Sequence, residues 1–209
     1  MYPLDQNLLN QFIVEALYED IHEGDHTSLA CIPADDRSRA KLLVKAEGVI
    51  AGVAVAEAIF KHVDPTSTID VKIKDGQDIQ YGDIAFYVEC NSQALLKAER
   101  LVLNTMQRLS GIATLSSRFA FEVEGLPVKI LDTRKTTPLI RFLEKWATIR
   151  FWRSTSSSSR TTNSSLSKGL VRYASAPRRR PAILEAASAL AVSNMIGILK
   201  SALRLSVRV

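Results

Sequence analysis

The chain of 209 residues changes character near residue 146, and this change limits what it can fold into. Residues 1–146 carry 16 Lys and Arg against 21 Asp and Glu, so their net charge is 16 − 21 = −5. Residues 147–209 carry 11 Lys and Arg against one acid, Glu185, which gives 11 − 1 = +10. Eleven of the fourteen residues 154–167 are Ser or Thr, and such a composition supplies no hydrophobic core. We therefore expect residues 147–209 to form an aberrant basic tail that is poorly ordered or non-native.

The first 121 residues show the periodicities of helices and strands in alternation. Apolar residues recur at three- and four-residue steps over 6–19, which predicts an amphipathic helix, and an Ala-rich run predicts a second helix over 53–62. Asp5 is a suitable N-cap for the first of them. Alternating or β-branched runs predict strands over 38–46, Ile69–Ile73 and Ile84–Cys90. A third helix is predicted over 91–121, with one wide apolar face and with Gly111 as the point where it could be interrupted.

A segment with two adjacent cations follows the predicted strand Val128–Leu131. It reads Asp132-Thr133-Arg134-Lys135-Thr136-Thr137-Pro138, and Pro138 is expected to open a helix over 138–146. In α/β barrels the C-terminal ends of the strands present such groups to ligands. Arg134 can bind a carboxylate or phosphate bidentately, and Lys135 adds a point charge. From the spacing alone, an ordinary solvated basic pair explains the segment equally well.

Several classes of protein are excluded or disfavoured. No stretch reaches the roughly 18 uninterrupted apolar residues of a membrane span, and Met1–Asp5 lacks the features of a signal peptide. Cys31 and Cys90 form no CxxC motif, which favours a reducing, cytoplasmic location and two small buried thiols. The excess of basic residues comes from the tail alone, so we expect no nucleic-acid partner and no membrane partner. Electrostatic binding of nucleic acid by the tail stays open as an alternative, although the tail offers no aromatic stacking platform.

Short motifs that occur in a fixed order make the N-terminal part resemble the quinolinate phosphoribosyltransferases, also called carboxylating nicotinate-nucleotide pyrophosphorylases. The motifs are Glu23-Gly24-Asp25-His26-Thr27-Ser28, Lys45-Ala46-Glu47-Gly48-Val49-Ile50-Ala51-Gly52, Gly76 with Gly82-Asp83, Glu99-Arg100, Leu103-Asn104, Gln107-Arg108-Leu109-Ser110-Gly111-Ile112-Ala113-Thr114 and Asp132-Thr133-Arg134-Lys135-Thr136-Thr137-Pro138. Each motif is weak by itself, but the ordered set over about residues 5–147 is specific.

The resemblance implies a reaction and a fold. Quinolinate and phosphoribosyl pyrophosphate, with Mg²⁺, would give nicotinate mononucleotide, pyrophosphate and carbon dioxide, a step in NAD biosynthesis. The fold would be an α+β N-terminal sandwich domain followed by a truncated α/β barrel. The domains would be 1–115, including a long connecting helix, then 116–146 as the start of the barrel, and then the tail 147–209. The family further implies a homodimer or higher homo-oligomer, in which one sandwich domain covers the partner's barrel mouth.

The substrate-binding residues implied by the resemblance are Arg100, Thr133, Arg134 and Lys135. Arg100 matches the arginine that reaches into the neighbouring subunit's site to hold a carboxylate of quinolinate. Without that match, Arg100 reads as a solvated helix residue, and no acid lies three or four positions from it. Arg108 fits helix packing or capping better than ligand binding, and His26 fits a turn-stabilising role better than acid–base catalysis. No catalytic nucleophile is expected, because positioning and electrostatics stabilise the departing pyrophosphate.

The family's later motifs do not appear after Trp146. The resemblance requires a glycine-rich turn, an Asn-His-Arg element, an Ile-Lys-Asp-Asn strand end and acidic residues for ribose and Mg²⁺, and the tail offers one acid and no His. Codons for Ile-Leu-Ile-Lys-Asp-Asn, read one base later, can give Ser-Ser-Ser-Arg-Thr-Thr, which is the sequence of residues 157–162. This agreement motivates the hypothesis that the tail is an out-of-frame translation, produced by a frameshift, missplicing or a sequencing error.

Loss of half the barrel has a functional consequence. The usual acidic ligands of Mg²⁺ are missing, so no metal-ligating residue is assigned, and we expect this chain alone not to catalyse phosphoribosyl transfer. Two alternatives stay open beside the family reaction. The chain could be a non-catalytic partner that donates Arg100 to an intact paralogue, or it could derive from a related pyrophosphorylase with another substrate.

Overall fold

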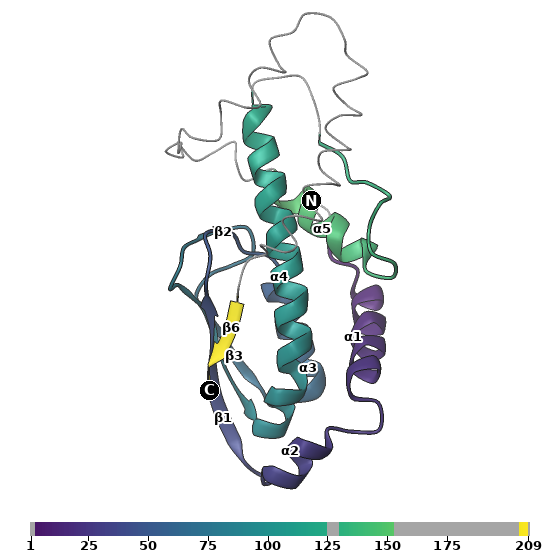
Figure 1. Ribbon diagram of the computed structural model, residues 1–209, viewed down its shortest axis with the longest axis vertical. Helices are drawn as coiled ribbons and strands as arrows, with labels where there is room; N and C mark the ends of the chain where they lie inside the picture. The colour runs from purple at the N-terminus through teal and green to yellow at the C-terminus, as the bar shows by residue number, and fades with distance from the viewer. Residues whose placement is uncertain (1–2, 125–129, 153–204, 209) are drawn as a thin grey trace, which may run out of the picture.

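The computed structural model describes residues 3–124, 130–152 and 205–208 (Figure 1). The helices are α1 (Gln6–Ile21), α2 (His26–Cys31), α3 (Val53–Val63), α4 (Ser92–Glu122) and α5 (Arg141–Trp152). The strands are β1 (Arg37–Val44), β2 (Gly48–Val49), β3 (Thr68–Val71), β4 (Asp78–Ile79), β5 (Ile84–Asn91) and β6 (Leu205–Arg208). The predicted α+β N-terminal domain is confirmed, and each helix and strand predicted within residues 6–121 is present with its ends shifted by a few residues.

The first helix begins where the sequence predicts. The Asp5 carboxylate accepts hydrogen bonds from the backbone N–H groups of Asn7 and Leu8, at 3.0 and 3.1 Å. These bonds satisfy two of the donors that a helix start leaves unpaired. A short helix that was not predicted from the sequence follows at α2, where the Asp25 carboxylate accepts from the backbone N–H of Ser28 at 3.1 Å. The Asp25–Ser28 spacing is therefore a capping signal for α2.

An antiparallel sheet forms one layer of the molecule, with strand order β3-β5-β1-β6. Strand β5 pairs with β1 from Arg37↔Asn91 to Leu43↔Ile84, with an irregularity between Leu42 and Leu43. Along β1 the buried residues Ala40, Leu42 and Val44 alternate with more exposed ones, so one face of the sheet turns to the core. Strands β2 and β4 make a separate two-stranded sheet.

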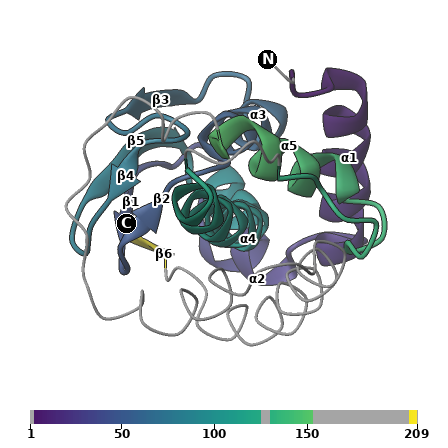
Figure 2. The ribbon, with the colours of Figure 1, turned by 90° about the horizontal axis from the view of Figure 1, so that it is seen from above.

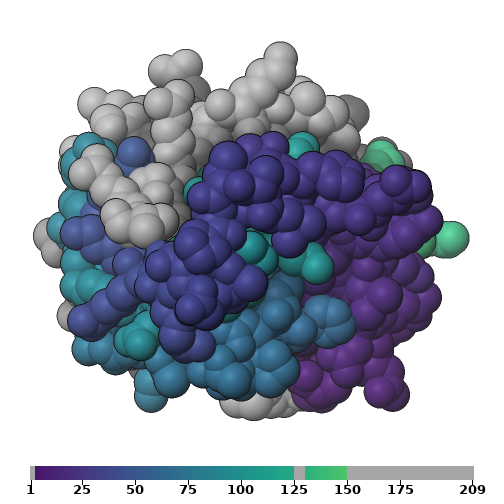
Figure 3. All heavy atoms as spheres, turned by 90° about the horizontal axis from the view of Figure 1, so that it is seen from below, coloured from purple at the N-terminus to yellow at the C-terminus, as the bar shows by residue number. Residues whose placement is uncertain are grey.

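Helix α4 is the centre of the molecule, as Figure 2 shows from above, with the sheet on one side and α1, α3 and α5 around the other. Its buried residues include Leu95, Val102, Met106 and Leu109, which lie on one face at helical spacing. From below, the residues of α1 and α2 cover much of the surface, and a small part of α4 is visible between them (Figure 3). Gly111 does not interrupt α4, which continues to Glu122 and so crosses the predicted domain boundary at residue 115.

The predicted start of the barrel differs from the structure. Residues 128–129 of the expected strand lie outside the described residues, and Ile130 and Leu131 have no regular secondary structure. Leu131 is 79% exposed, and no strand of the described residues pairs with it. The predicted helix begins at Arg141 rather than at Pro138, because Leu139 adopts a left-handed backbone with φ 68°. Within residues 130–152, α5 is the only regular element.

Two parts of the predicted tail are ordered elements. Helix α5 continues past residue 146 to Trp152, and Ala147 on it is fully buried beside Leu143 and Trp146 in the core. The predicted boundary was therefore a few residues too early, because an apolar face of this helix packs on α4. Strand β6 pairs antiparallel with β1, from Lys41↔Arg208 to Val44↔Leu205, and adds an edge strand to the sheet. Residues 153–204, most of the predicted tail, lie outside the described residues.

Candidate anion-binding site

The segment that carries the predicted cations lies on the surface immediately before α5. Thr133, Arg134 and Lys135 are all exposed. The backbone N–H of Lys135 donates to the Thr133 hydroxyl at 3.1 Å, so a local turn shapes the segment. Among the described residues, neither Arg134 nor Lys135 has an ion-pair partner. Two adjacent cations without counter-charges can accept an anionic ligand.

Arginines hold this segment at both ends. The Asp132 carboxylate pairs with Arg141 at 2.9 Å, which joins the start of the segment to the first residue of α5. At the other end the Thr137 hydroxyl accepts a hydrogen bond from the guanidinium of Arg108 on α4. These two anchors were not anticipated from the sequence. They are formed by residues 9 and 29 positions apart, a separation at which no periodic pattern operates.

Arg108 also pairs with Glu144, whose side chain is 4% exposed. Two nitrogens of the guanidinium, Nε and Nη2, contact the same carboxylate oxygen, Oε1. A buried carboxylate without a cation would destabilise the fold, so this pair fixes α5 on α4. The expectation that Arg108 packs helices rather than binding ligand is consistent with this contact.

Arg100 lies away from the cation segment. Its side chain on α4 is 74% exposed and pairs with Asp20 of α1 at 2.9 Å. No acid lies three or four positions from Arg100 in the sequence, and the partner comes instead from another helix, 80 positions earlier in the chain. Asp20 is near the C-terminal end of α1, whereas the cation segment leads into α5 near the opposite end of α1 (Figure 1). The structure therefore brings Thr133, Arg134 and Lys135 together, and it leaves Arg100 apart, on the surface.

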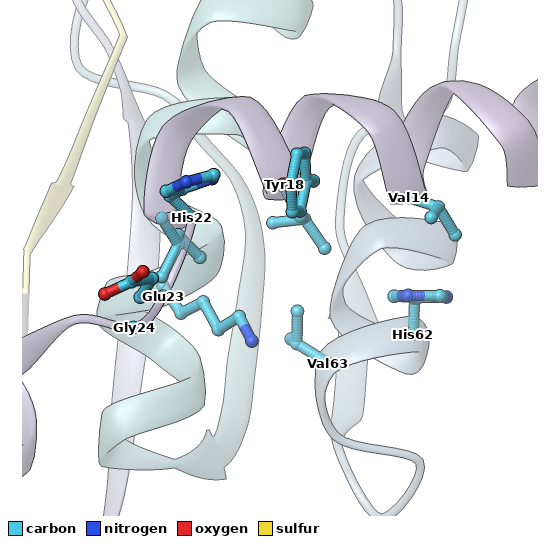
Figure 4. Close-up of a pocket in the computed structure, with 10 residues that line it drawn as sticks. Val14, Tyr18, His22, Glu23, Gly24, His62 and Val63 are labelled. Carbon is cyan, nitrogen blue, oxygen red and sulfur yellow. The ribbon is translucent and has the colours of Figure 1, made fainter.

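A cleft of about 400 Å³ lies between α1, α3 and α4 (Figure 4). Its lining includes Tyr18, His22, His62 and Lys97, and none of the predicted site residues. Lys97 precedes Arg100 by one helical turn, so the cleft opens on the same region of α4 as Arg100. His22 and His62 are both exposed.

The described residues do not fit a magnesium site. No group of three or more His, Cys, Asp or Glu side chains gathers in the described part of the chain. Near the cation segment, Asp132 is occupied by Arg141 and Glu144 by Arg108. Mg²⁺ requires several oxygen ligands, and carboxylates that already bind guanidinium groups do not supply them. We therefore derive no catalytic step through a metal from these residues.

His26 is the first residue of α2 and has no catalytic partner in the described contacts. Its neighbour Asp25 caps the helix, and the hydrogen bonds from Ser28 hold the pKa of the Asp25 carboxyl below its ordinary value. The motif around His26 therefore starts a helix.

The two cysteines differ in exposure. Cys31 at the end of α2 is exposed, so its predicted burial is wrong, whereas Cys90 on β5 is buried. Burial raises the pKa of the Cys90 thiol to about 11.

No helix in the described part of the chain is long and apolar enough to cross a membrane.

Two family descriptions match adjacent parts of the sequence. "Quinolinate phosphoribosyl transferase, N-terminal domain" matches residues 25–110, and "Quinolinate phosphoribosyl transferase, C-terminal domain" matches residues 112–150. The second match ends close to the point where the composition changes.

Individual relatives agree with the family matches. The chain is 44% identical over 142 residues to the chloroplastic nicotinate-nucleotide pyrophosphorylase (carboxylating) of Arabidopsis thaliana, which covers 68% of this chain and 40% of that protein. It is 43% identical over 142 residues to the mitochondrial quinolinate phosphoribosyltransferase (decarboxylating) 2b of Nicotiana tabacum, with the same coverage. Among solved structures, NadC from Streptococcus pyogenes superposes with a TM-score of 0.68 at 28% identity, covering 90% of this chain and 66% of that one.

The chain spans less than half the length of these two curated relatives. Within that span, the order of the motifs, the α+β domain and the superposition on a solved structure agree with one another. By its N-terminal 150 residues, the chain belongs to the quinolinate phosphoribosyltransferase family.

Proposed function

We propose that the protein takes part in the reaction that converts quinolinate and phosphoribosyl pyrophosphate to nicotinate mononucleotide, pyrophosphate and carbon dioxide. The names of the relatives support this proposal. The observation that carries it for this chain is the pair of exposed cations, Arg134 and Lys135, which have no ion-pair partner among the described residues and lie in a segment anchored at both ends. Quinolinate has two adjacent carboxylates and phosphoribosyl pyrophosphate has clustered phosphates, so both substrates require such groups.

In this proposal each predicted residue has a distinct role. Arg134 binds a carboxylate or phosphate through its planar fork, and Lys135 adds a mobile charge beside it. The Thr133 hydroxyl already accepts from the Lys135 backbone, and it can donate its own proton to an anion. Arg100, exposed on α4, binds the substrate of a neighbouring subunit, which makes the working unit a homodimer or higher homo-oligomer.

The polypeptide alone does not complete this chemistry. Mg²⁺ accompanies phosphoribosyl pyrophosphate in the proposed reaction, but the described acids near the cation segment are paired with arginines. The later family motifs are absent from the sequence after Trp146. We therefore propose that this chain binds substrate anions weakly and catalyses no turnover by itself. The cytoplasm is the proposed compartment, supported by two cysteines that are both free in the structure.

A titration followed by NMR tests the binding proposal, because it detects weak complexes. Quinolinate added to the ¹⁵N-labelled chain should shift the backbone amides of Thr133, Arg134 and Lys135, and nicotinate, with one carboxylate, should shift them less. Arg134→Gln should weaken quinolinate binding about tenfold or more, since it removes a charge-assisted pair. Arg118→Gln, at an exposed arginine elsewhere on α4, is the matched control. Equal shifts for quinolinate and nicotinate, or no effect of Arg134→Gln, would contradict the proposal.

A second candidate function is that of a non-catalytic partner for an intact paralogue. The exposure of Arg100 favours it, because a side chain that is 74% exposed can exchange its surface pair with Asp20 for a group on another subunit. Co-purification with a full-length relative would support this function. A related pyrophosphorylase with another substrate is the remaining alternative, and stronger binding of a different pyridine acid in the same titration would indicate it.

A further inference from the structure

We infer that Arg108 is a positioning residue, which holds the cation segment in place through Thr137. This inference deepens the proposed function and rests on it, because the segment carries Thr133, Arg134 and Lys135. Arg108 itself lies on α4, its side chain is 24% exposed, and its guanidinium already contacts Glu144 and Thr137.

The guanidinium of Arg108 contacts both helix α5 and the cation segment. Nε and Nη2 contact the carboxylate of Glu144, which is almost fully buried on α5. Nη2 also donates to the hydroxyl of Thr137, which is exposed at the end of the segment. One planar group therefore connects the long central helix, the helix that follows the segment and the segment itself. A lysine, with a single nitrogen, does not reproduce this fork.

The segment needs such an anchor because it has no regular secondary structure of its own. Residues 131–140 form no helix or strand, and Leu131 and Leu139 at its ends are exposed. Its internal hydrogen bond from Lys135 to Thr133 shapes only three residues. The anchor at Asp132 leads to Arg141, whose side chain is 48% exposed, whereas the anchor at Thr137 leads to the Arg108–Glu144 pair, whose side chains are 24% and 4% exposed. Exposed ion pairs contribute little to stability, so Thr137, held by the less exposed pair, is the firmer attachment.

Thr137→Val tests this inference, because it removes the bond to the segment and leaves the Arg108–Glu144 pair intact. Trypsin cleavage after Arg134 and Lys135, followed by mass spectrometry, reports how often the segment opens. We expect cleavage there to be about tenfold faster in Thr137→Val, with an unchanged thermal unfolding temperature. Thr136→Val is the matched control, since no described contact of the Thr136 side chain is lost. Arg108→Gln should accelerate cleavage at least as much and also lower the unfolding temperature.

A second measurement separates this inference from the proposed function. If the segment binds quinolinate, Thr137→Val should weaken the NMR-detected affinity several-fold, while Thr136→Val should not. If the unaltered chain shows no quinolinate shifts but Thr137→Val still accelerates cleavage, the proposed function is wrong and the positioning role of Arg108 stands. If Thr137→Val and Thr136→Val are cleaved at the rate of the unaltered chain, the positioning role is wrong.

Discussion

At the scale of single residues, Asp64 shows how one carboxylate joins distant parts of the chain. Its oxygens accept from the Thr66 backbone at 2.8 Å, the Thr66 hydroxyl at 2.6 Å and the Asn91 backbone at 2.9 Å. The hydrogen bond from the Thr66 side chain, then that from Asn91, holds the pKa of Asp64 below its ordinary value of 3.8. Asp64 therefore joins the end of α3 to the junction of β5 and α4.

This shift predicts a dependence of stability on pH. A carboxyl group with a lower pKa in the folded state stabilises that state above its unfolded pKa, and the stabilisation is lost as pH falls through the folded pKa. We expect Asp64→Asn to lower the free energy of unfolding by about 1–3 kcal/mol at neutral pH, because an amide cannot accept at both positions. The loss of stability below about pH 4 should be smaller in this variant. Urea unfolding at pH 7 and at several lower values measures both effects.

The matched control for this measurement is Asp70→Asn. Asp70 on β3 pairs with Lys72 at 2.7 Å, and both side chains are about half exposed. Surface pairs of this kind contribute roughly 0–1 kcal/mol, so Asp70→Asn should leave the unfolding curve nearly unchanged at neutral pH. If the two variants behave alike at pH 7, the network around Asp64 does not stabilise the fold as proposed.

At the scale of elements, the contact between α3 and α4 depends on a glycine. Gly52 precedes α3 with φ 103°, a left-handed backbone that side chains disfavour. A Cβ at this position would meet Met106 Cγ at 3.2 Å and Met106 Cα at 3.3 Å, and the second of these atoms belongs to the α4 backbone. Gly111 lies within α4, where a Cβ would meet nothing within 4 Å.

These two glycines predict opposite effects of the same substitution. Gly52→Ala should destabilise the fold by about 1–3 kcal/mol, because it adds backbone strain and overpacks the helix contact. Gly111→Ala should stabilise it by about 0.5–1 kcal/mol, since alanine is the better helix former in an open position. Chemical denaturation of the two variants beside the parent chain measures both changes. A destabilised Gly111→Ala variant would show that α4 needs flexibility at this point.

The success of sequence reasoning also differs between elements. Periodicity located α1 and α4, because their buried faces repeat within one helix, and an Ala-rich run located α3. It missed α2, which is six residues long and begins at a cap rather than with an apolar stripe. It failed for Ile130 and Leu131, because an apolar run forms a strand only where another strand pairs with it. The ion pairs Asp20–Arg100 and Arg108–Glu144 were not predictable, since the helices meet only in the folded chain.

At the scale of the whole molecule, a core forms from the N-terminal part with α5, and β6 extends its sheet. Residues from α1, α3, α4, α5 and the strands share one hydrophobic cluster, which includes Trp146 and Ala147 of α5. The core therefore includes residues of α5, while the two family descriptions divide the chain between residues 110 and 112, close to the predicted boundary at 115. The family assignment and the ordered core agree that this part of the chain keeps the family's geometry. Its exposed Arg100 is then available for a role between subunits.

Complementation tests whether Arg100 acts on a neighbouring subunit. We expect this chain to restore pyrophosphate release when it is mixed and refolded with an intact family enzyme whose matching arginine is replaced by alanine. Only mixed oligomers would combine a complete barrel with a cationic side chain from this chain. The activity should rise at least tenfold above that of the altered enzyme alone, because a desolvated charge pair to a carboxylate is restored. A coupled assay of pyrophosphate release measures it.

Two variants of this chain make the complementation specific to Arg100. Arg100→Ala should abolish the restored activity, and Arg118→Ala, at another exposed arginine of α4, should retain it. Asp20→Asn removes the surface partner of Arg100 and should leave the restored activity unchanged or slightly higher, because the side chain is then free to bind substrate. Equal restoration by the Arg100→Ala chain would mean that the mixed oligomer works through other contacts. Mixed oligomers that form but release no pyrophosphate with any variant would exclude Arg100 as a donor between subunits.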